Sequence, residues 1–278
     1  MNIVIHAQLF SPRWPASLLA GLAILLVLLA CAVFPGQLSP YDPLMFDYAA
    51  LQQSPSAAHW FGTDNFGRDI LARVISAARI DVQIAFFGTI GPLLIGSIIG
   101  LLAGYFGGWA DILPGRVMDL VLTFPFLVIV IAIVAVLGPG LVNMYVAVTL
   151  VGWVFYARLM RGEVLLQKQA DYVAAARVLG YDTSRILFRH ILPNAVRPVL
   201  VYLVTDMALK ILLGSSLGYL GLGAQPPEAE WGVLIADGKN FFTQAWWMTF
   251  FPGVAIVLAG LGFSLAGDGL ADLMDVKR

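Results

Sequence analysis

Six stretches of the chain are long, apolar and nearly free of charge, and polar segments separate them. They cover residues 15–34, 82–105, 120–137, 141–157, 198–222 and 245–266. About 20 apolar residues are enough for a helix to cross a bilayer, and the short fourth stretch reaches that length if its helix continues beyond residue 157. The pattern therefore predicts an all-α, polytopic membrane protein with six transmembrane helices.

The polar segments divide this bundle into three expected parts. Residues 1–34 hold the N-terminus and the first transmembrane helix, and residues 35–80 form a loop with a capped amphipathic helix over residues 68–79 lying at the membrane surface. Residues 81–278 form a core of five helices. A cleaved signal is an alternative for the first stretch, because Leu-Leu-Ala-Cys at 28–31 resembles a lipoprotein cleavage site. The later stretches anchor the chain in either case.

Composition supports the membrane class and excludes several functions. The chain is 60% hydrophobic and only 12% charged, whereas about 25% charged residues is usual for a soluble domain. A net charge of −1 gives no electrostatic footprint for nucleic acid. The single cysteine excludes an intrachain disulfide and a cysteine-based metal site. Because no Gly-x4-Gly-Lys-Ser/Thr phosphate loop occurs, we expect no ATP site and no cofactor in this chain.

The most polar segment inside the apolar core is residues 163–197. Residues 163–179 are strong helix formers, and Gly180 is a typical residue to end a helix. A second short helix is expected after a cap at residues 182–184, with Pro193 closing it. The segment therefore predicts a rigid helix–glycine–helix unit. Its small side chains Ala174, Ala175 and Ala176 would let the surface of another protein approach closely.

This segment resembles the EAA loop of ABC importer permeases, which reads Glu-Ala-Ala-x3-Gly and, nine residues later, Ile-x-Leu-Pro. Ala174 stands where that family usually has Glu, and His190 where the general pattern has Ile. In the family this loop docks into a groove of a separate ATPase subunit. The resemblance implies the following ATPase-coupling residues: Asp171, Ala174, Ala175, Ala176, Arg177, Gly180, His190 and Pro193.

A second stretch, at residues 59–71, resembles a signature of the dipeptide, oligopeptide and nickel branch of the same family. Two glycines in it permit tight turns, and its charged side chains can form a local cluster of ion pairs and hydrogen bonds. The residues of this external-loop signature are Gly62, Thr63, Asp64, Gly67, Arg68 and Asp69.

Two ionisable residues, Asp206 and Lys210, lie inside the fifth apolar stretch. Their spacing of four places them on one helix face, within reach of each other. The pair is either a self-neutralising contact between helices or part of a translocation path, because charges at this depth usually face a bundle interior or a wet cavity. The loop that follows resembles the family's last loop. Its Glu228, Glu230 and Trp231 are candidates for contact with a docking protein, and a solvated loop with one interfacial aromatic is the alternative.

The distribution of positive charge predicts the orientation. Eleven Lys and Arg residues fall on the side of the 163–197 segment, four fall on the opposite side, and Lys210 lies within a stretch. Because cytoplasmic loops are enriched in Lys and Arg, we expect this segment and both termini to be cytoplasmic.

The resemblance implies the second, C-type permease chain of an ABC importer in the bacterial inner membrane, with the type I bundle of that class. It implies a heterodimer with a homologous permease, two ATPase subunits that hold ATP and Mg²⁺, and an extracytoplasmic solute-binding protein. The cargo would be a dipeptide, an oligopeptide, or a nickel or opine-type metal chelate. An intramembrane enzyme is an alternative, but the three histidines are scattered and no catalytic cluster is evident. A self-sufficient secondary transporter would show an internal repeat, and none is evident.

Overall fold

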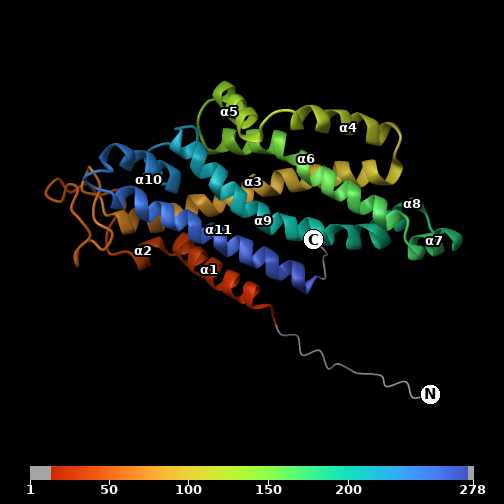
Figure 1. The fold of residues 1–278 in the computed structure, drawn as a ribbon, viewed down its shortest axis with the longest axis horizontal. Coiled ribbons are helices and arrows are strands. Elements are labelled where there is room, and N and C mark those ends of the chain that lie inside the picture. The colour runs from red at the N-terminus through yellow and green to blue at the C-terminus, as the bar shows by residue number, and fades with distance from the viewer. Residues whose placement is uncertain (1–13, 275–278) are drawn as a thin grey trace, which may run out of the picture.

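The computed structural model describes residues 14–274, and the named secondary-structure elements of that range are all helices (Figure 1). The long helices run side by side along one axis, and the short ones lie at the two ends of the bundle or on its flank. In chain order the elements are α1 (Ala16–Val33), α2 (Pro35–Leu38), α3 (Ile70–Phe106), α4 (Trp109–Leu122), α5 (Phe126–Leu137), α6 (Leu141–Lys168), α7 (Asp171–Val178), α8 (Thr183–Arg185), the π-helix η1 (Ile186–Ile191), α9 (Leu192–Tyr219), α10 (Trp231–Gly238), the 3-10 helix η2 (Lys239–Phe241) and α11 (Trp247–Leu273).

Close packing of α3 against α6 forms the centre of the bundle. Gly96, Gly100 and Gly104 lie four residues apart on α3 and face the backbone of α6. A Cβ atom at Gly96 would lie 2.3 Å from the carbonyl oxygen of Trp153, and one at Gly100 would lie 2.4 Å from that of Ala157. Only glycine fits at these two places, as is common where membrane helices approach closely.

Helix α3 is longer than the sequence pattern predicts. It runs without a break from Ile70 to Phe106, so the separate surface helix expected over residues 68–79 is wrong, and the expected border at residue 80 falls inside α3. The carboxylate of Asp69 caps its first turn by accepting a hydrogen bond from the Ala72 amide at 2.8 Å. Asp81 does not interrupt the helix, because its buried carboxylate accepts a hydrogen bond from the amide of Trp231 at 3.2 Å.

The third apolar stretch is broken instead of continuous. Helix α4 already begins at Trp109, where a short loop was expected, and α5 begins at Phe126; the two helices meet at an angle of 91°. The break falls at Thr123–Pro125, because proline lacks an amide hydrogen and disfavours helical geometry at the preceding residue. The stretch expected to span the membrane over 120–137 is therefore not one continuous helix.

Within residues 14–274, four helices are long and apolar enough to cross a membrane, namely α1, α3, α6 and α11. The number is five if the bent pair α4–α5 counts as one span. The predicted count of six is not confirmed, since α9 is not among these spans. Many large apolar side chains on the outside are exposed, among them Leu26 at 69% and Val142 at 72%, as expected of a surface that faces lipid.

The order of the helices places the two ends of the described chain together. The first residues of α1 and the last residues of α11 lie toward the end of the bundle that carries α7 and α8, whereas the 39–69 loop and α10 lie at the opposite end (Figure 1). This arrangement agrees with the expected placement of the termini on one side. Arg13, Lys277 and Arg278, which contributed to the charge count, lie outside the described residues.

Candidate functional site

The 163–197 segment forms a compact projection at one end of the bundle, which we call the coupling segment. Helix α6 continues beyond residue 157 as expected, but it ends at Lys168, and α7 begins anew at Asp171. The expected single helix over 163–179 is therefore wrong. Gly180 follows α7 with φ of 76°, a conformation that favours glycine, and the amide of Tyr181 donates to the carbonyl of Ala176 at 3.1 Å.

The second half of the coupling segment merges with the next long helix. The side chain of Asp182 caps the Arg185 amide at 3.1 Å, as the sequence predicted for this turn. The π-helix η1 then leads directly into α9, where Pro193 occupies the first turn. The expectation that Pro193 closes a short helix is wrong, because proline is well tolerated where a helix begins.

The three small side chains of α7 do not share one surface. Ala174 and Ala175 are exposed, whereas Ala176 is 3% exposed and turned into the bundle. The expectation that Ala176 faces a partner is therefore wrong. It is buried in an apolar cluster that packs the coupling segment against α6 and α9. Other members of this cluster are Met160, Val164, Val173, Ile186, Leu187 and Ile191.

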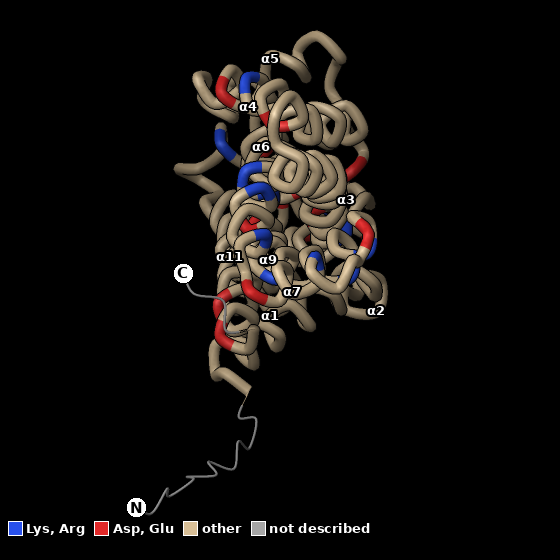
Figure 2. The backbone as a smooth tube through the Cα atoms, turned by 90° about the vertical axis from the view of Figure 1, so that its right-hand side faces the viewer, with Lys and Arg blue, Asp and Glu red and all other residues tan. Residues whose placement is uncertain are grey.

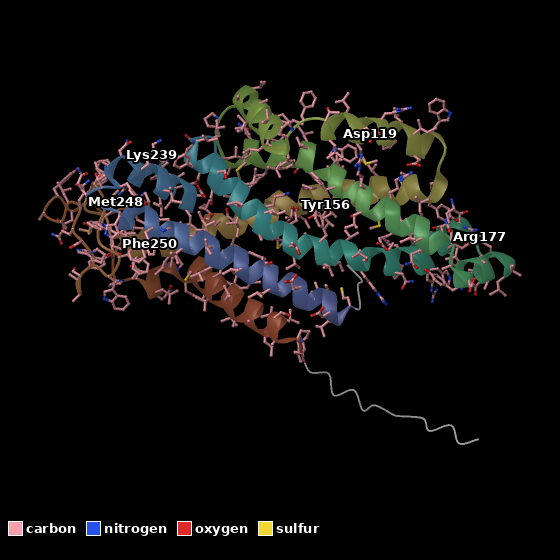
Figure 3. The ribbon with its side chains drawn as sticks, viewed as in Figure 1. Asp119, Tyr156, Arg177, Lys239, Met248 and Phe250 are labelled. Carbon is pink, nitrogen blue, oxygen red and sulfur yellow. The ribbon has the colours of Figure 1, made fainter. Side chains whose placement is uncertain are left out.

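The remaining predicted coupling residues lie around this exposed surface. Asp171, Arg177 and Pro193 are exposed, and Figure 3 shows Arg177 at the end of the bundle. His190 is half-buried, its ring stacks on Tyr181 with centroids 5.7 Å apart, and its Nε2 is buried without a hydrogen-bond partner among the described residues. Figure 2 views this end of the molecule, where Lys and Arg positions recur around α6 and α9. The exposed face thus combines small and basic side chains with large apolar ones, among them Val178 at 88%, Leu179 at 69% and Phe188 at 57% exposed.

Asp206 and Lys210 form a buried ion pair in the middle of α9. The Lys210 Nζ lies 2.9 Å from Asp206 Oδ1, and the two residues are only 2% and 5% exposed. The hydroxyl of Tyr156 on α6 donates to the other carboxylate oxygen at 2.9 Å, a partner that sequence spacing could not reveal. Tyr156 lies in the centre of the bundle (Figure 3).

A cavity of about 340 Å³ opens beside this ion pair, between α5, α6 and α9. Lys210 reaches into it with its Nζ 5.3 Å from the centre of the Phe126 ring. The rest of the wall is apolar and aromatic apart from one serine, and it includes Leu127, Phe155, Tyr202, Leu209, Leu212, Leu213 and Ser216.

The external-loop signature folds into a buried ionic cluster, as the sequence predicted. Asp64 is fully buried and accepts hydrogen bonds from Arg68 Nε at 2.6 Å and from Arg73 Nη1 at 2.7 Å. Arg73 also lies 3.2 Å from Asp237 at the end of α10. Asp69 bonds His59 Nδ1 at 2.9 Å in addition to capping α3. The sequence reasoning missed Arg73, His59 and Asp237.

The other signature residues shape the loop around this cluster. The Thr63 carbonyl accepts a hydrogen bond from the Trp247 indole at 3.0 Å, which ties the loop to α11. Gly62 and Gly67 both have positive φ, and a Cβ atom at Gly67 would lie 1.7 Å from the Asp47 carbonyl oxygen. The signature therefore holds the loop, α3, α10 and α11 together.

Two of the three residues expected to contact a docking protein are buried. Glu230 is 0% exposed and caps α10 through the amides of Gly232 at 2.8 Å and Val233 at 3.0 Å. Trp231 is 2% exposed, and its indole donates to the Val74 carbonyl at 3.0 Å. The expectation of a docking role is therefore wrong for both, and only Glu228 remains exposed.

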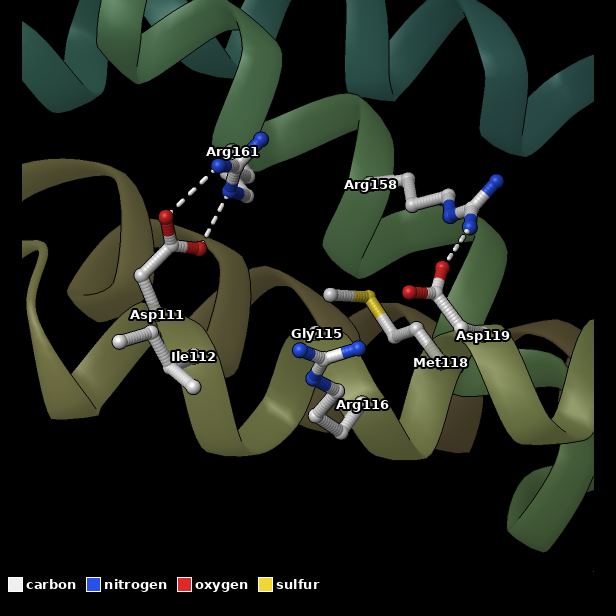
Figure 4. A pocket seen from close by; sticks show the side chains of 8 residues that line it. All are labelled: Asp111, Ile112, Gly115, Arg116, Met118, Asp119, Arg158 and Arg161. Carbon is white, nitrogen blue, oxygen red and sulfur yellow. Dashed lines mark hydrogen bonds and ion pairs between the residues drawn. The ribbon is translucent and has the colours of Figure 1, made fainter.

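A second hollow, of about 550 Å³, lies between α4 and α6 and was not expected from the sequence (Figure 4). Arg161 pairs with Asp111 through two hydrogen bonds, and Arg158 pairs with Asp119 at 2.7 Å. Arg116 lies between the two pairs without a hydrogen bond or ion pair to any residue that the structure describes. Arg158 lines this hollow and Phe155 lines the cavity beside Lys210. Because these two residues lie about one turn apart on α6, the hollow is next to that cavity along the helix.

Comparison with known proteins gives a family match and several relatives. Residues 96–278 match the family described as "Binding-protein-dependent transport system inner membrane component". The chain is 41% identical over 259 residues to the dipeptide transport system permease protein DppC of Alkalihalophilus pseudofirmus, covering 93% of this chain and 85% of the relative. It is 41% identical over 266 residues to the glutathione transport system permease protein GsiD of Pectobacterium atrosepticum, covering 95% and 88%. The oligopeptide transport system permease protein OppC of Bacillus subtilis is 39% identical over 259 residues, covering 93% and 85%.

Proposed function

Because this chain belongs to the binding-protein-dependent inner-membrane components, and among them to the peptide importer permeases of the ABC class, we propose that it forms one half of a peptide translocation path. The chain is a membrane transport subunit and not an enzyme. The other half of the path would be a homologous permease in a heterodimer. ATP would be hydrolysed, with Mg²⁺, on two separate ATPase subunits, and an extracytoplasmic solute-binding protein would deliver the cargo.

The observation that carries this proposal is the exposed face of the coupling segment. Ala174 and Ala175 present almost no side chain, so the surface of a partner can approach the backbone of α7 closely. Behind them, Val173 and Ala176 are buried against the bundle. A push on α7 would therefore be transmitted as a rigid movement, because packed cores deform little. The Glu that the family usually has at position 174 is absent, so docking here would rely on shape, on the basic side chains and on exposed apolar ones such as Val178 and Leu179.

We place the coupling segment and both termini in the cytoplasm of a bacterium, with the 39–69 loop and α10 on the outer side of the inner membrane. The excess of Lys and Arg at the coupling end supports this orientation. When ATP closes the ATPase dimer, the two coupling segments would move together and the bundle would open outward to receive the cargo.

For the cargo, we propose small peptides, since relatives that are 39% to 41% identical to this chain are named as dipeptide, glutathione and oligopeptide permeases. A nickel or opine-type chelate is the second candidate. Within residues 14–274, no three His, Cys, Asp or Glu side chains gather where they could hold a metal ion. A chelate would therefore have to cross as an intact complex.

Reconstitution of the complete transporter tests the proposal. This chain, its homologous permease, the ATPases and the binding protein are placed together in proteoliposomes, and uptake of radiolabelled dialanine is measured with and without ATP. We expect uptake that requires ATP, the binding protein and this chain. Uptake that proceeds without ATP, or that is unchanged when this chain is omitted, would contradict the proposal.

A further inference from the structure

The structure contains one buried ion pair that borders a cavity, and its chemistry suits a ligand with two opposite charges. Asp206 and Lys210 neutralise each other at 2.9 Å, and both are almost fully buried. A charge left alone at such a depth is costly, so any ligand that separates the two must compensate both of them. A ligand with one positive and one negative group meets this condition, whereas a ligand with a single charge does not.

We propose that Asp206, Lys210 and Tyr156 form a binding site for the zwitterionic backbone of a small peptide, in which the peptide ammonium pairs with Asp206 and its terminal carboxylate pairs with Lys210. This inference rests on the proposed function and deepens it. Each of the two protein charges has one opposite-charge partner before and after the peptide enters, since it exchanges the other protein charge for one end of the peptide. The site stays neutral throughout.

The geometry of the three side chains supports this exchange. Tyr156 donates to Asp206 Oδ2, whereas Lys210 occupies Oδ1, so the carboxylate keeps one fixed partner while the other is exchanged. The stem of Lys210 packs near Gly88 on α3, where a Cβ atom would lie 3.4 Å from Lys210 Cγ. The ammonium group can turn away from Asp206 into the cavity, because Phe126 offers it a ring face at 5.3 Å.

The cavity itself fits a small amphipathic solute. Its volume of about 340 Å³ is at the lower end of the range of about 300–1,000 Å³ that is common for small-molecule sites. Its wall is formed mainly by leucine and aromatic side chains, with a few polar groups that can fix the orientation of a ligand, which is typical of small-molecule sites. Leu209 and Leu212 at its rim are exposed at 53% and 57%. In the proposed heterodimer, a homologous permease would face this rim across the translocation path.

Uptake by the complete transporter tests the site with three probes: dialanine, its C-terminal amide, which lacks the negative charge, and its N-acetyl form, which lacks the positive charge. For each variant, the uptake rate of a blocked probe is divided by that of dialanine. The same binding protein is used throughout, so its own preference cancels when a variant is compared with wild type. A loss of expression also cancels in this ratio.

We expect Lys210→Met to raise the amide-to-dialanine ratio by about tenfold over wild type, because the remaining Asp206 now favours a cation. Asp206→Asn should raise the acetyl-to-dialanine ratio by a similar factor. Thr249→Ala, a change on α11 outside this cavity, should leave both ratios unchanged. Ratios that stay at the wild-type values in both single variants would overturn the inference.

A second measurement keeps the inference testable if the charge variants fail to assemble. Leu209→Cys is introduced with Cys31→Ala, and the rate of thiol modification at the rim of the cavity is measured in the complete transporter. Saturating dialanine should slow this modification by at least about fivefold, and equal amounts of the amide and acetyl probes should not. Equal protection by all three probes, or by none, would contradict the zwitterion site. If wild type shows no ATP-dependent uptake of dialanine, the proposed function fails instead.

Discussion

The two segments that carry family signatures, one at each end of the bundle, use their signature residues in opposite ways. In the external loop, Asp64 is 0% exposed and both of its oxygens accept several hydrogen bonds. In the coupling segment, Ala174 and Ala175 are exposed and contribute no side-chain bonds. The first signature therefore maintains the shape of this chain, whereas the second leaves an exposed surface on which we propose that another chain docks. A shared signature alone does not distinguish these roles, but burial does.

The largest effect should come from the external cluster. Asp64→Ala leaves the buried guanidinium of Arg73 without its closest carboxylate, which lies 2.7 Å away. Removing one partner of a buried pair costs about 3–5 kcal/mol, so we expect little assembled protein. The amount of this chain in the membrane and the unfolding temperature of the solubilised complex measure the effect.

Asp237→Asn is the matched control, because this partner of Arg73 has a side chain that is 37% exposed. Its loss should cost only about 0–1 kcal/mol. If the two variants are equally stable, the buried pair of Asp64 and Arg73 does not hold the loop to α3, and the contrast between the two ends is lost.

The buried pair on α9 should show the next largest effect. Neutralising either Asp206 or Lys210 alone leaves one buried charge without its partner, whereas neutralising both leaves none. We expect each single variant to be less stable than the double variant by at least about 2 kcal/mol. Expression and thermal unfolding of Asp206→Asn, Lys210→Met and the double variant provide the comparison. Equal losses in all three would indicate that each residue has an individual role instead.

Two neighbouring alanines on α7 test the division between surface and core most simply. Ala175→Trp adds bulk to the exposed face, so uptake should fall by more than about tenfold while the free energy of unfolding changes by no more than about 0.5 kcal/mol. Ala176→Trp forces the same bulk into the buried cluster and should cost at least about 1–3 kcal/mol. Normal uptake by a stably assembled Ala175→Trp transporter would show that nothing docks on this face.

The smallest effect is expected at the turn of the coupling segment. Gly180 has φ of 76°, and no atom lies within 4 Å of the place where its Cβ would be, so a substitution meets backbone strain and no steric clash. Gly180→Val should cost about 1–2 kcal/mol, whereas Gly180→Asn, which tolerates this conformation, should cost less. Equal unfolding temperatures for the two variants would show that the turn does not limit the stability of α7.

Local signals in the sequence were sufficient for much of the fold. The caps at Asp69 and Asp182 and the i,i+4 pair on α9 depend on neighbours that are close in sequence, and all appear in the structure. The dipeptide Phe124-Pro125 lies at the α4–α5 break, so a local signal for the break is present in the sequence, although a continuous span was expected there. A rule on the residue before proline could have located this bend.

Other errors concern contacts between residues far apart in the chain. Asp81 could not be recognised as compatible with a long helix, because the amide that satisfies it belongs to Trp231, 150 residues away. The burial of Glu230 depends on α10, which the glycine- and proline-rich loop did not predict. Tyr156 bonds Asp206 across 50 residues, so the site around the ion pair could be assembled only from the structure.

The most direct test of the account is the location of position 175 in the assembled transporter. A single cysteine is introduced as Ala175→Cys with Cys31→Ala, and its reaction with a membrane-impermeant thiol reagent is compared in intact cells and in inverted membrane vesicles. A bifunctional reagent then tests its proximity to the ATPase. We expect modification only in inverted vesicles, and a cross-link to an ATPase subunit whose yield changes when ATP is bound. Modification from the outside of intact cells, or no cross-link to an ATPase subunit, would contradict the account.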